Sequence, residues 1–102
     1  MISSKRKEAK MNELILEGVV RSISESRNFE TKDGVIHTER ELLVETEEMH
    51  PQTCAVRTVD AVAMQTYVPG GRVRCHLQLR AAQAKQSGRW FNDIKAWRVE
   101  ML

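Results

Sequence analysis

The chain has 102 residues, of which 41% are hydrophobic and 29% are charged, and its formal net charge is +2. This length predicts one domain, because domains commonly run to roughly 100–150 residues. No apolar run approaches the ~20 residues that cross a bilayer, and the basic first ten residues lack the apolar stretch of a secretory signal, so we expect a cytoplasmic protein without a membrane partner.

Residues 13–23 are the first predicted strand. They are rich in β-branched and aliphatic side chains, and Gly18 in their middle suits a bulge or a sharp bend. Residues 24–34 are polar and end in the turn dipeptide Asp33-Gly34. This segment therefore predicts a loop or the wings of a long hairpin.

The middle of the chain continues with two more predicted strands. Residues 35–46 alternate between apolar and polar side chains, which is the period of a half-buried strand. A connection containing Pro51 follows, and residues 53–59 predict a short strand. The outward face of the first of these two strands is acidic and holds Glu39, Glu41 and Glu45.

One short helix is predicted, over residues 61–67. Asp60 precedes it in the position of an N-cap, where its carboxylate can accept from backbone N–H groups of the first turn. Pro69, Gly70 and Gly71 end the helix, because proline is disfavoured inside a helix and glycine accepts left-handed backbone geometry. The helix therefore lies between the third and fourth predicted strands.

The last third of the chain predicts two further strands. Residues 72–80 show the clearest alternation in the sequence, with apolar side chains on one side and cationic or polar ones on the other. A polar connection over residues 81–88 leads to the final strand, residues 89–100. This strand contains three of the aromatic residues, Trp90, Phe91 and Trp97.

Five strands with one short helix between the third and the fourth predict an all-β fold. A sheet this small can protect its edges by curling into a barrel that the helix closes at one end. We therefore predict a five-stranded OB-fold barrel over residues 11–102. Residues 1–10 are interpreted either as a flexible basic arm that gathers around phosphates or as an over-long start.

Two segments of the chain resemble a known family. They are LLVETEE at residues 42–48, followed by Pro51, Cys54 and Asp60, and SGRWFNDIKAWRVE at residues 87–100. The resemblance runs from Met11 onward, and residues 88–97 are its most specific part. The family is a bacterial one of small single-domain proteins catalogued as a domain of unknown function. The resemblance implies an OB-fold similar to single-stranded DNA-binding proteins.

Charge is unevenly distributed along the chain. Residues 1–10 carry +3, residues 11–69 carry −6 and residues 70–102 carry +5. A basic carboxyl-terminal third attracts a polyanion, but two oppositely charged surfaces also attract each other within one molecule or between copies. Composition leaves both interpretations open.

The carboxyl-terminal third contains the elements of a single-stranded nucleic-acid site, which are basic side chains along a groove and aromatic rings on which bases stack. The alternation of the final strand places Phe91, Lys95 and Trp97 on one face. Two basic residues flank the preceding connection, one of the loops with which OB-folds bind oligonucleotides. The candidate binding residues are Arg80, Lys85, Arg89, Trp90, Phe91, Lys95, Trp97 and Arg98.

Each part of this candidate site has a second interpretation. A chain with few aromatic residues needs some of them in its core, so Trp97 is equally interpreted as buried packing. Arg72 and Arg74 are expected to pair across strands with Glu13 and Glu17. The acidic face of the second strand lies where OB-folds commonly receive nucleic acid, so we expect binding to be weak or displaced toward the last two strands.

No motif in the sequence supports catalysis. His37, His50 and His76, with Cys54 and Cys75, lack the close paired spacing of zinc ligands. We expect surface histidines, a core Cys75 and cysteines that remain thiols. The sequence therefore predicts a non-enzymatic protein without a metal site, a cofactor or a small-molecule substrate.

These observations lead to two hypotheses of function. The first is an OB-fold module that binds single-stranded nucleic acid, which we expect to be DNA, with little sequence preference. The second is a protein–protein interaction or self-assembly module, in which the acidic face of one copy meets the basic carboxyl-terminal face of another copy or of a different partner.

Overall fold

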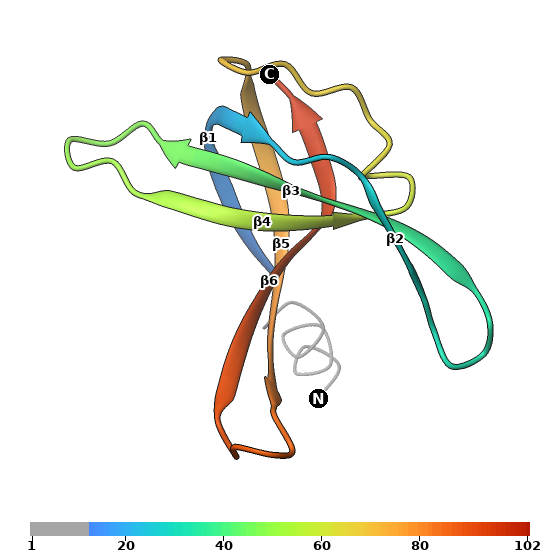
Figure 1. Ribbon diagram of the computed structural model, residues 1–102. Helices are drawn as coiled ribbons and strands as arrows, with labels where there is room; N and C mark the ends of the chain where they lie inside the picture. Colours follow the sequence, from blue (N-terminus) through green and yellow to red (C-terminus); the bar gives the residue numbers. More distant parts are fainter. Residues whose placement is uncertain (1–12) are drawn as a thin grey trace, which may run out of the picture.

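The computed structural model describes residues 13–102, which form an all-β chain of six strands (Figure 1). The predicted amino-terminal arm, residues 1–10, lies outside the described residues. The strands are β1 (Glu13–Ile23), β2 (Arg27–Glu30), β3 (Ile36–Thr46), β4 (Thr53–Val59), β5 (Arg72–Gln83) and β6 (Trp90–Met101). The predicted all-β class is confirmed, whereas the predicted strand number is wrong by one.

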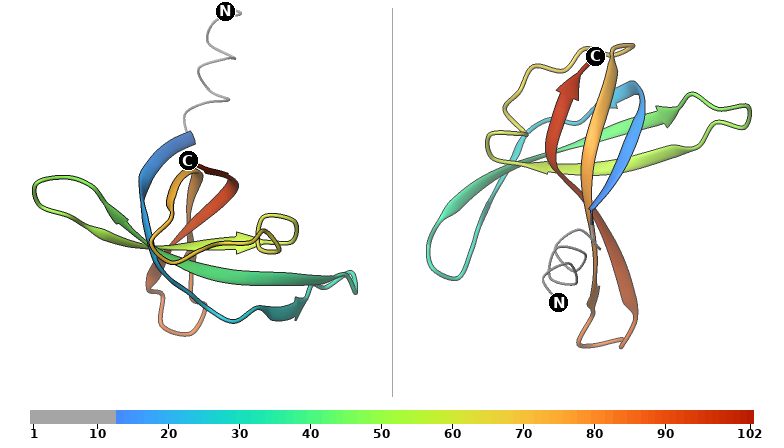
Figure 2. Two further views of the ribbon diagram at one scale, coloured as in Figure 1. Left: turned by 90° about the horizontal axis from the view of Figure 1, so that it is seen from above. Right: turned by 180° about the vertical axis from the view of Figure 1, so that it is seen from behind.

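The strand pairings run in a closed cycle. β1 pairs with β5, β5 with β6, β6 with β4 and β4 with β3, and β3 returns to β1. All of these pairs are antiparallel except β4 with β6, which is parallel. β2 adds to the cycle by pairing with the first part of β3. Figure 2 shows the strands crossing one another around a shared interior.

β1 changes its partner at Gly18. This residue faces Val73 of β5 in one ladder and Thr46 of β3 in the other. A Cβ added at Gly18 would lie 2.3 Å from the carbonyl oxygen of Glu45, a distance that real Cβ atoms essentially never show. The lack of a side chain therefore allows the backbones of β1 and β3 to approach where the cycle closes.

Every strand of the cycle contributes to one hydrophobic core. The predicted alternation of β5 is confirmed over its first half, where Val73, Cys75 and Leu77 are buried. Cys75 is a core residue, as predicted, and burial raises the pKa of its thiol to about 11. Leu79 is more exposed, because from there β5 continues beyond the core. The largest fully buried side chains are Leu42, Val20, Val44, Val56, Val73, Thr58 and Cys75.

The predicted helix over residues 61–67 is absent. The segment between β4 and β5 forms turns, and no residue of 13–102 is helical, so the described chain has no helix that could cross a membrane. The expected cap does not form, because the Asp60 carboxylate contacts Thr38 and His37 of β3 instead. The segment nevertheless closes the core, because Ala63 and Tyr67 are buried and the Tyr67 hydroxyl donates to the carbonyl of Val62 at 2.6 Å.

Asp60 is not a helix cap. Its φ is +54°, and its carboxylate accepts a hydrogen bond from the backbone N–H of Thr38 at 3.2 Å. The other carboxylate oxygen lies 2.8 Å from Nδ1 of His37. Asp60 therefore holds the end of β4 against β3.

Two hairpins extend beyond the core toward the same side of the molecule (Figure 1). The β2–β3 hairpin, turning at residues 31–35, is the long hairpin that was one of the two predictions for residues 24–34. The β5–β6 hairpin turns at residues 84–89, largely within the connection predicted over residues 81–88, of which only residues 81–83 belong to β5. We call its outer part, residues 81–92, the β5–β6 arm. We call the outward surface of β3, β4 and β6 between the two hairpins the central face.

Replacing Gly18 by alanine is expected to lower the free energy of unfolding by roughly 1–3 kcal/mol, because the new methyl group forces the paired backbones apart. Urea unfolding followed by circular dichroism measures this loss. Ser22→Ala, at an exposed position of the same strand, is the control and should change stability by less than about 0.5 kcal/mol. Equal stability of the two variants would contradict the role given to Gly18.

Candidate functional site

A row of alternating cationic and acidic side chains crosses the central face. Nε of Arg27 lies 3.0 Å from the Glu39 carboxylate, which in turn lies 3.6 Å from Nη1 of Arg57. Arg57 also donates to both carboxylate oxygens of Asp93, at 3.1 and 2.7 Å. Asp93 lies 3.5 Å from Nε of Arg80. We call these five residues the ion-pair ladder.

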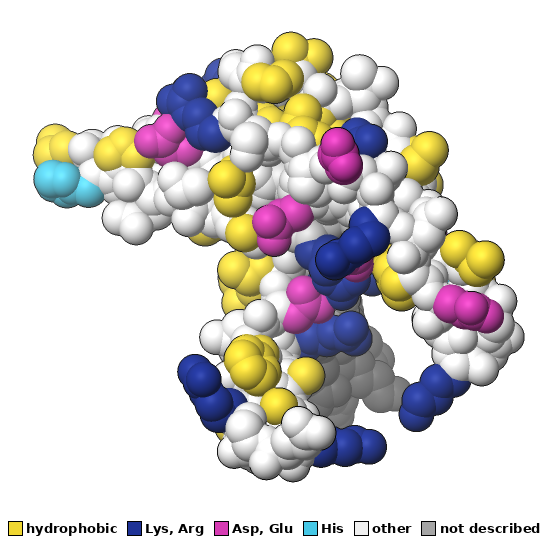
Figure 3. Space-filling model, in the orientation of Figure 1, with side chains coloured by type: hydrophobic (Ala, Val, Ile, Leu, Met, Phe, Trp, Pro, Cys, Tyr) yellow, Lys and Arg dark blue, Asp and Glu magenta, His cyan; other side chains and the backbone are white. Residues whose placement is uncertain are grey.

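The ladder follows from the register of the strands. Arg27 of β2 is directly opposite Glu39 of β3, and Arg80 of β5 is directly opposite Asp93 of β6. β4 brings Arg57 beside β6, and its long side chain reaches the acids on both sides. Figure 3 shows dark blue and magenta side chains alternating over this face. The ladder thus joins five of the six strands.

Arg57 is the central and most enclosed cation of the ladder. Its side chain is 26% exposed, against 78% for Arg27 and 69% for Arg80. Its hydrogen bonds hold the pKa of Asp93 below the ordinary value, and Asp93 and then Glu39 raise the pKa of Arg57. Asp93 is therefore ionised at neutral pH, and the Arg57 guanidinium has an acidic partner on each side, Glu39 and Asp93.

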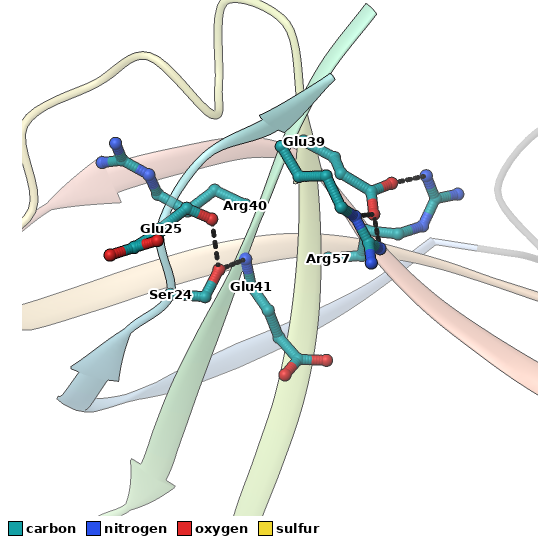
Figure 4. A pocket seen from close by; sticks show the side chains of 7 residues that line it. Ser24, Glu25, Glu39, Arg40, Glu41 and Arg57 are labelled. Atoms are coloured by element: carbon teal, nitrogen blue, oxygen red, sulfur yellow. Dashed lines mark hydrogen bonds and ion pairs between the residues drawn. The ribbon is translucent and has the colours of Figure 1, made fainter. Parts of the chain in front are cut away.

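A hollow of about 400 Å³ lies beside the ladder (Figure 4). In Figure 4 the Glu39 carboxylate points toward two guanidinium groups, whereas the Glu41 carboxylate points away from them. Three arginines and three glutamates line the hollow, so it has no formal excess of positive charge that would attract an anion. The lining residues are Ser24, Glu25, Arg27, Glu39, Arg40, Glu41 and Arg57.

The three aromatic residues predicted to stack on bases are exposed to solvent. Trp90 is 66% exposed, Phe91 52% and Trp97 46%. The interpretation of Trp97 as buried packing is therefore wrong. Trp97 points outward because its strand neighbour Ala96 points into the core, and it is also the unpaired residue where the β5–β6 register shifts. Its ring centroid lies 5.2 Å from that of His76.

The β5–β6 arm carries an aromatic ring on each face, because successive residues of a strand point to opposite sides. The Arg89 guanidinium lies 5.7 Å from the Phe91 ring centroid, a cation–π contact. Trp90 shares the other face with Leu79 and Ile94, which line a second hollow of about 360 Å³. Arg80, Lys85 and Arg89 lie on or at the end of the same arm.

Some basic residues of the predicted site form ion pairs within the chain, and others do not. Arg80 is paired with Asp93, and Arg98 lies 3.8 Å from the Glu100 carboxylate. Lys85, Arg89 and Lys95 have no carboxylate within 4.0 Å among residues 13–102. These three cations therefore carry the available positive charge of the predicted site.

Arg72 and Arg74 are paired, as predicted, but one partner differs. Nε of Arg74 lies 2.5 Å from the Glu17 carboxylate across the β1–β5 ladder. Nε of Arg72 lies 2.8 Å from the carboxylate of Glu47, which follows β3. Neither arginine lies on the central face or the arm.

Sequence reasoning missed the cations of the acidic half of the chain. Arg27 and Arg57 join the central face only because β2, β3 and β4 bring them there. Lys32 also has no carboxylate within 4.0 Å among the described residues, and it lies in the turn of the β2–β3 hairpin. The turn dipeptide Asp33-Gly34 directly after Lys32 is the sequence feature that could have placed this lysine at an exposed hairpin turn. No group of three or more His, Cys, Asp or Glu residues within 13–102 is arranged to hold a metal ion.

The fold and the sequence both place the chain among known proteins. The second OB-fold domain of replication protein A from Methanococcus maripaludis has a TM-score of 0.66 at 14% identity, covering 86% of this chain and 81% of that one. The wild-type single-stranded DNA-binding protein from Thermus aquaticus has a TM-score of 0.60 at 17% identity, covering 89% and 50%. These likenesses establish an OB-fold.

A third structure, the N-terminal domain of an archaeal MCM, has a TM-score of 0.65 at 16% identity, covering 87% of this chain and 55% of that one. Residues 15–100 match the family described as a domain of unknown function (DUF3127), and the chain belongs to this family. The resemblance predicted from residues 42–48 and 87–100 is thereby confirmed. No curated protein matches the sequence.

Arg57→Gln is expected to lower the free energy of unfolding by about 1 kcal/mol at pH 7, because Asp93 and Glu39 keep their charges and lose a shared donor. The folded-state pKa of Asp93 lies below the ordinary 3.8. Its stabilisation is therefore complete above the unfolded-state pKa and is lost as the pH falls through the folded value.

Urea unfolding at pH 7 and at pH 3 tests this expectation, since the deficit of the Arg57→Gln variant should shrink at the lower pH. Arg21→Gln removes the same charge from the more exposed pair with Glu45 and should cost less than about 0.5 kcal/mol. A deficit of equal size at both pH values would show that Asp93 does not depend on Arg57.

Proposed function

We propose that the chain is a non-enzymatic OB-fold module that binds single-stranded nucleic acid, which we expect to be DNA, along the β5–β6 arm. One observation carries the proposal. Three exposed rings, Trp90, Phe91 and Trp97, lie on the arm or on β6 beside it, among cations that no carboxylate of residues 13–102 holds. The fold likeness to a single-stranded DNA-binding protein supports it at the level of the fold.

The two kinds of side chain supply the two interactions that such binding needs. Lys85, Arg89 and Lys95 neutralise phosphates, and each exposed ring offers a surface on which a base can stack, worth ~1–3 kcal/mol per base. Stacking tolerates every base, because each has a π-face. The arm therefore favours binding with little sequence preference. Arg80 and Arg98 contribute less, because Asp93 and Glu100 already neutralise part of their charge.

The interaction-module hypothesis has weaker support. It requires Glu39, Glu41 and Glu45 to present an acidic face to another copy. Glu39 pairs with Arg27 and Arg57, and Glu45 lies 2.5 Å from Nε of Arg21 within the same molecule. Much of the attraction for a basic partner is therefore already satisfied internally.

Titration with an oligo(dT) is expected to quench tryptophan fluorescence, because two of the three rings are indoles. The logarithm of affinity should fall with the logarithm of salt concentration with a slope of ~0.7 for each neutralised phosphate, or about 2 for three cations. Lys85→Gln with Arg89→Gln should weaken binding at low salt and reduce this slope by roughly 1.4. Phe91→Ala should weaken binding without changing the slope.

The matched control is Arg21→Gln with Arg72→Gln, which removes the same net charge from paired residues elsewhere on the surface. It should bind oligo(dT) nearly as tightly as the unaltered protein. Absence of any binding at low ionic strength would contradict the proposed function. Equal loss in both double variants would show that net charge, and not the arm, determines binding.

A further inference from the structure

The centre of the face between the two hairpins contains three guanidinium groups, and carboxylates of the same chain hold all three. Glu39 lies between Arg27 and Arg57, and Asp93 lies between Arg57 and Arg80. A carboxylate presents two oxygens to a guanidinium in much the same way as a phosphate does. The donors that a nucleic-acid backbone would use are therefore already engaged.

We propose that Glu39 and Asp93 are internal competitors of nucleic-acid phosphates, which close the central face to the nucleic-acid backbone and confine binding to the β5–β6 arm. This inference rests on the proposed function, because it specifies the path of that ligand and what limits its affinity. It assigns a role in binding to two acidic residues that need not touch the nucleic acid.

The position of the two acids makes them effective competitors. The Glu39 side chain is 16% exposed and the Asp93 side chain 29% exposed, so both are confined between strands and cannot swing far into solvent. Arg27 and Arg80 are much more exposed and can turn toward a ligand. A phosphate that meets either arginine still approaches an ionised carboxylate, and like-charge repulsion weakens the contact.

Acidic conditions would be needed to remove this competition by protonation. Hydrogen bonds from Arg57, aided by Arg80, hold the pKa of Asp93 below its ordinary value. Asp93 therefore keeps its charge through the neutral range. Lys85 and Arg89 have no carboxylate within 4.0 Å among residues 13–102, which is why the ligand path is predicted to follow the arm. Lys95 lies opposite Arg57 on the central face and helps to lower the pKa of Asp60.

The test replaces both acids by their neutral amides, Glu39→Gln with Asp93→Asn. The amide oxygens can still accept hydrogen bonds from Arg57, so the ladder keeps its shape while losing two negative charges. We expect affinity for oligo(dT) to rise about tenfold at low salt and the salt slope to rise by ~0.7 for each additional phosphate engaged. The length of oligo(dT) needed to saturate binding should also increase.

The matched control replaces two acids away from the central face, Glu17→Gln with Glu47→Gln, the partners of Arg74 and Arg72. It changes the net charge by the same amount and releases Arg72, while Arg74 keeps the Glu100 carboxylate at 3.9 Å. Its salt slope and saturating length should stay at the values of the unaltered protein. Urea unfolding verifies that both variants fold. If the double variant does not fold, Glu39→Gln alone is tested in its place. This single variant leaves the Arg57–Asp93 contact intact and should raise affinity for oligo(dT) roughly threefold.

The outcomes separate this inference from the proposed function. Binding by the unaltered protein that is unchanged in Glu39→Gln with Asp93→Asn, or increased equally in the control, overturns the inference and leaves the proposed function standing. Binding by this double variant alone supports the competition and contradicts the proposed function for the unaltered chain. Absence of binding in every variant contradicts both.

Discussion

The short parallel contact between β4 and β6 is the constraint on which the structure depends. The other neighbours in the cycle pair as antiparallel ladders, whereas this closure uses only two residue pairs, Arg57 with Lys95 and Thr58 with Ala96. Thr58 and Ala96 point into the core, and the Thr58 hydroxyl donates to the Arg40 carbonyl at 2.7 Å. Arg57 points outward and reaches Asp93. Arg57 thus takes part both in the β4–β6 pairing that closes the fold and in the ion pairs of the central face.

The closure divides the outer surface into regions of different character. On the central face two acids, Glu39 and Asp93, hold the three arginines of the ladder, while the β5–β6 arm combines exposed rings with cations that no carboxylate holds. Under the proposed function, this distribution predicts a short contact with nucleic acid that is sensitive to salt. Fold and charge pattern therefore carry separate information, since the likeness to known OB-folds does not reveal which part of the surface is available.

Local patterns in the sequence predicted most of the strands and half of the candidate site. Alternation located β3, β4 and β5, and the aromatic and basic residues of the arm could be found because they are close in sequence. The predicted helix failed because burial of Ala63 and Tyr67 requires only a compact segment, whatever its backbone. The ladder could not be predicted, since Arg57 and Asp93 are 36 positions apart and meet only through the β4–β6 register.

The β5–β6 arm is a two-stranded ribbon that extends past the core, and such ribbons are only marginally stable by themselves. Backbone order there depends on its own ladder of hydrogen bonds and on the turn at residues 84–89, where the Gln83 amide donates to the Gly88 carbonyl at 2.9 Å. A partner that contacted Trp90 and Phe91 on opposite faces would stabilise this ribbon and reduce its fraying. The cost is conformational entropy, so recognition at the arm would be accompanied by local rigidification.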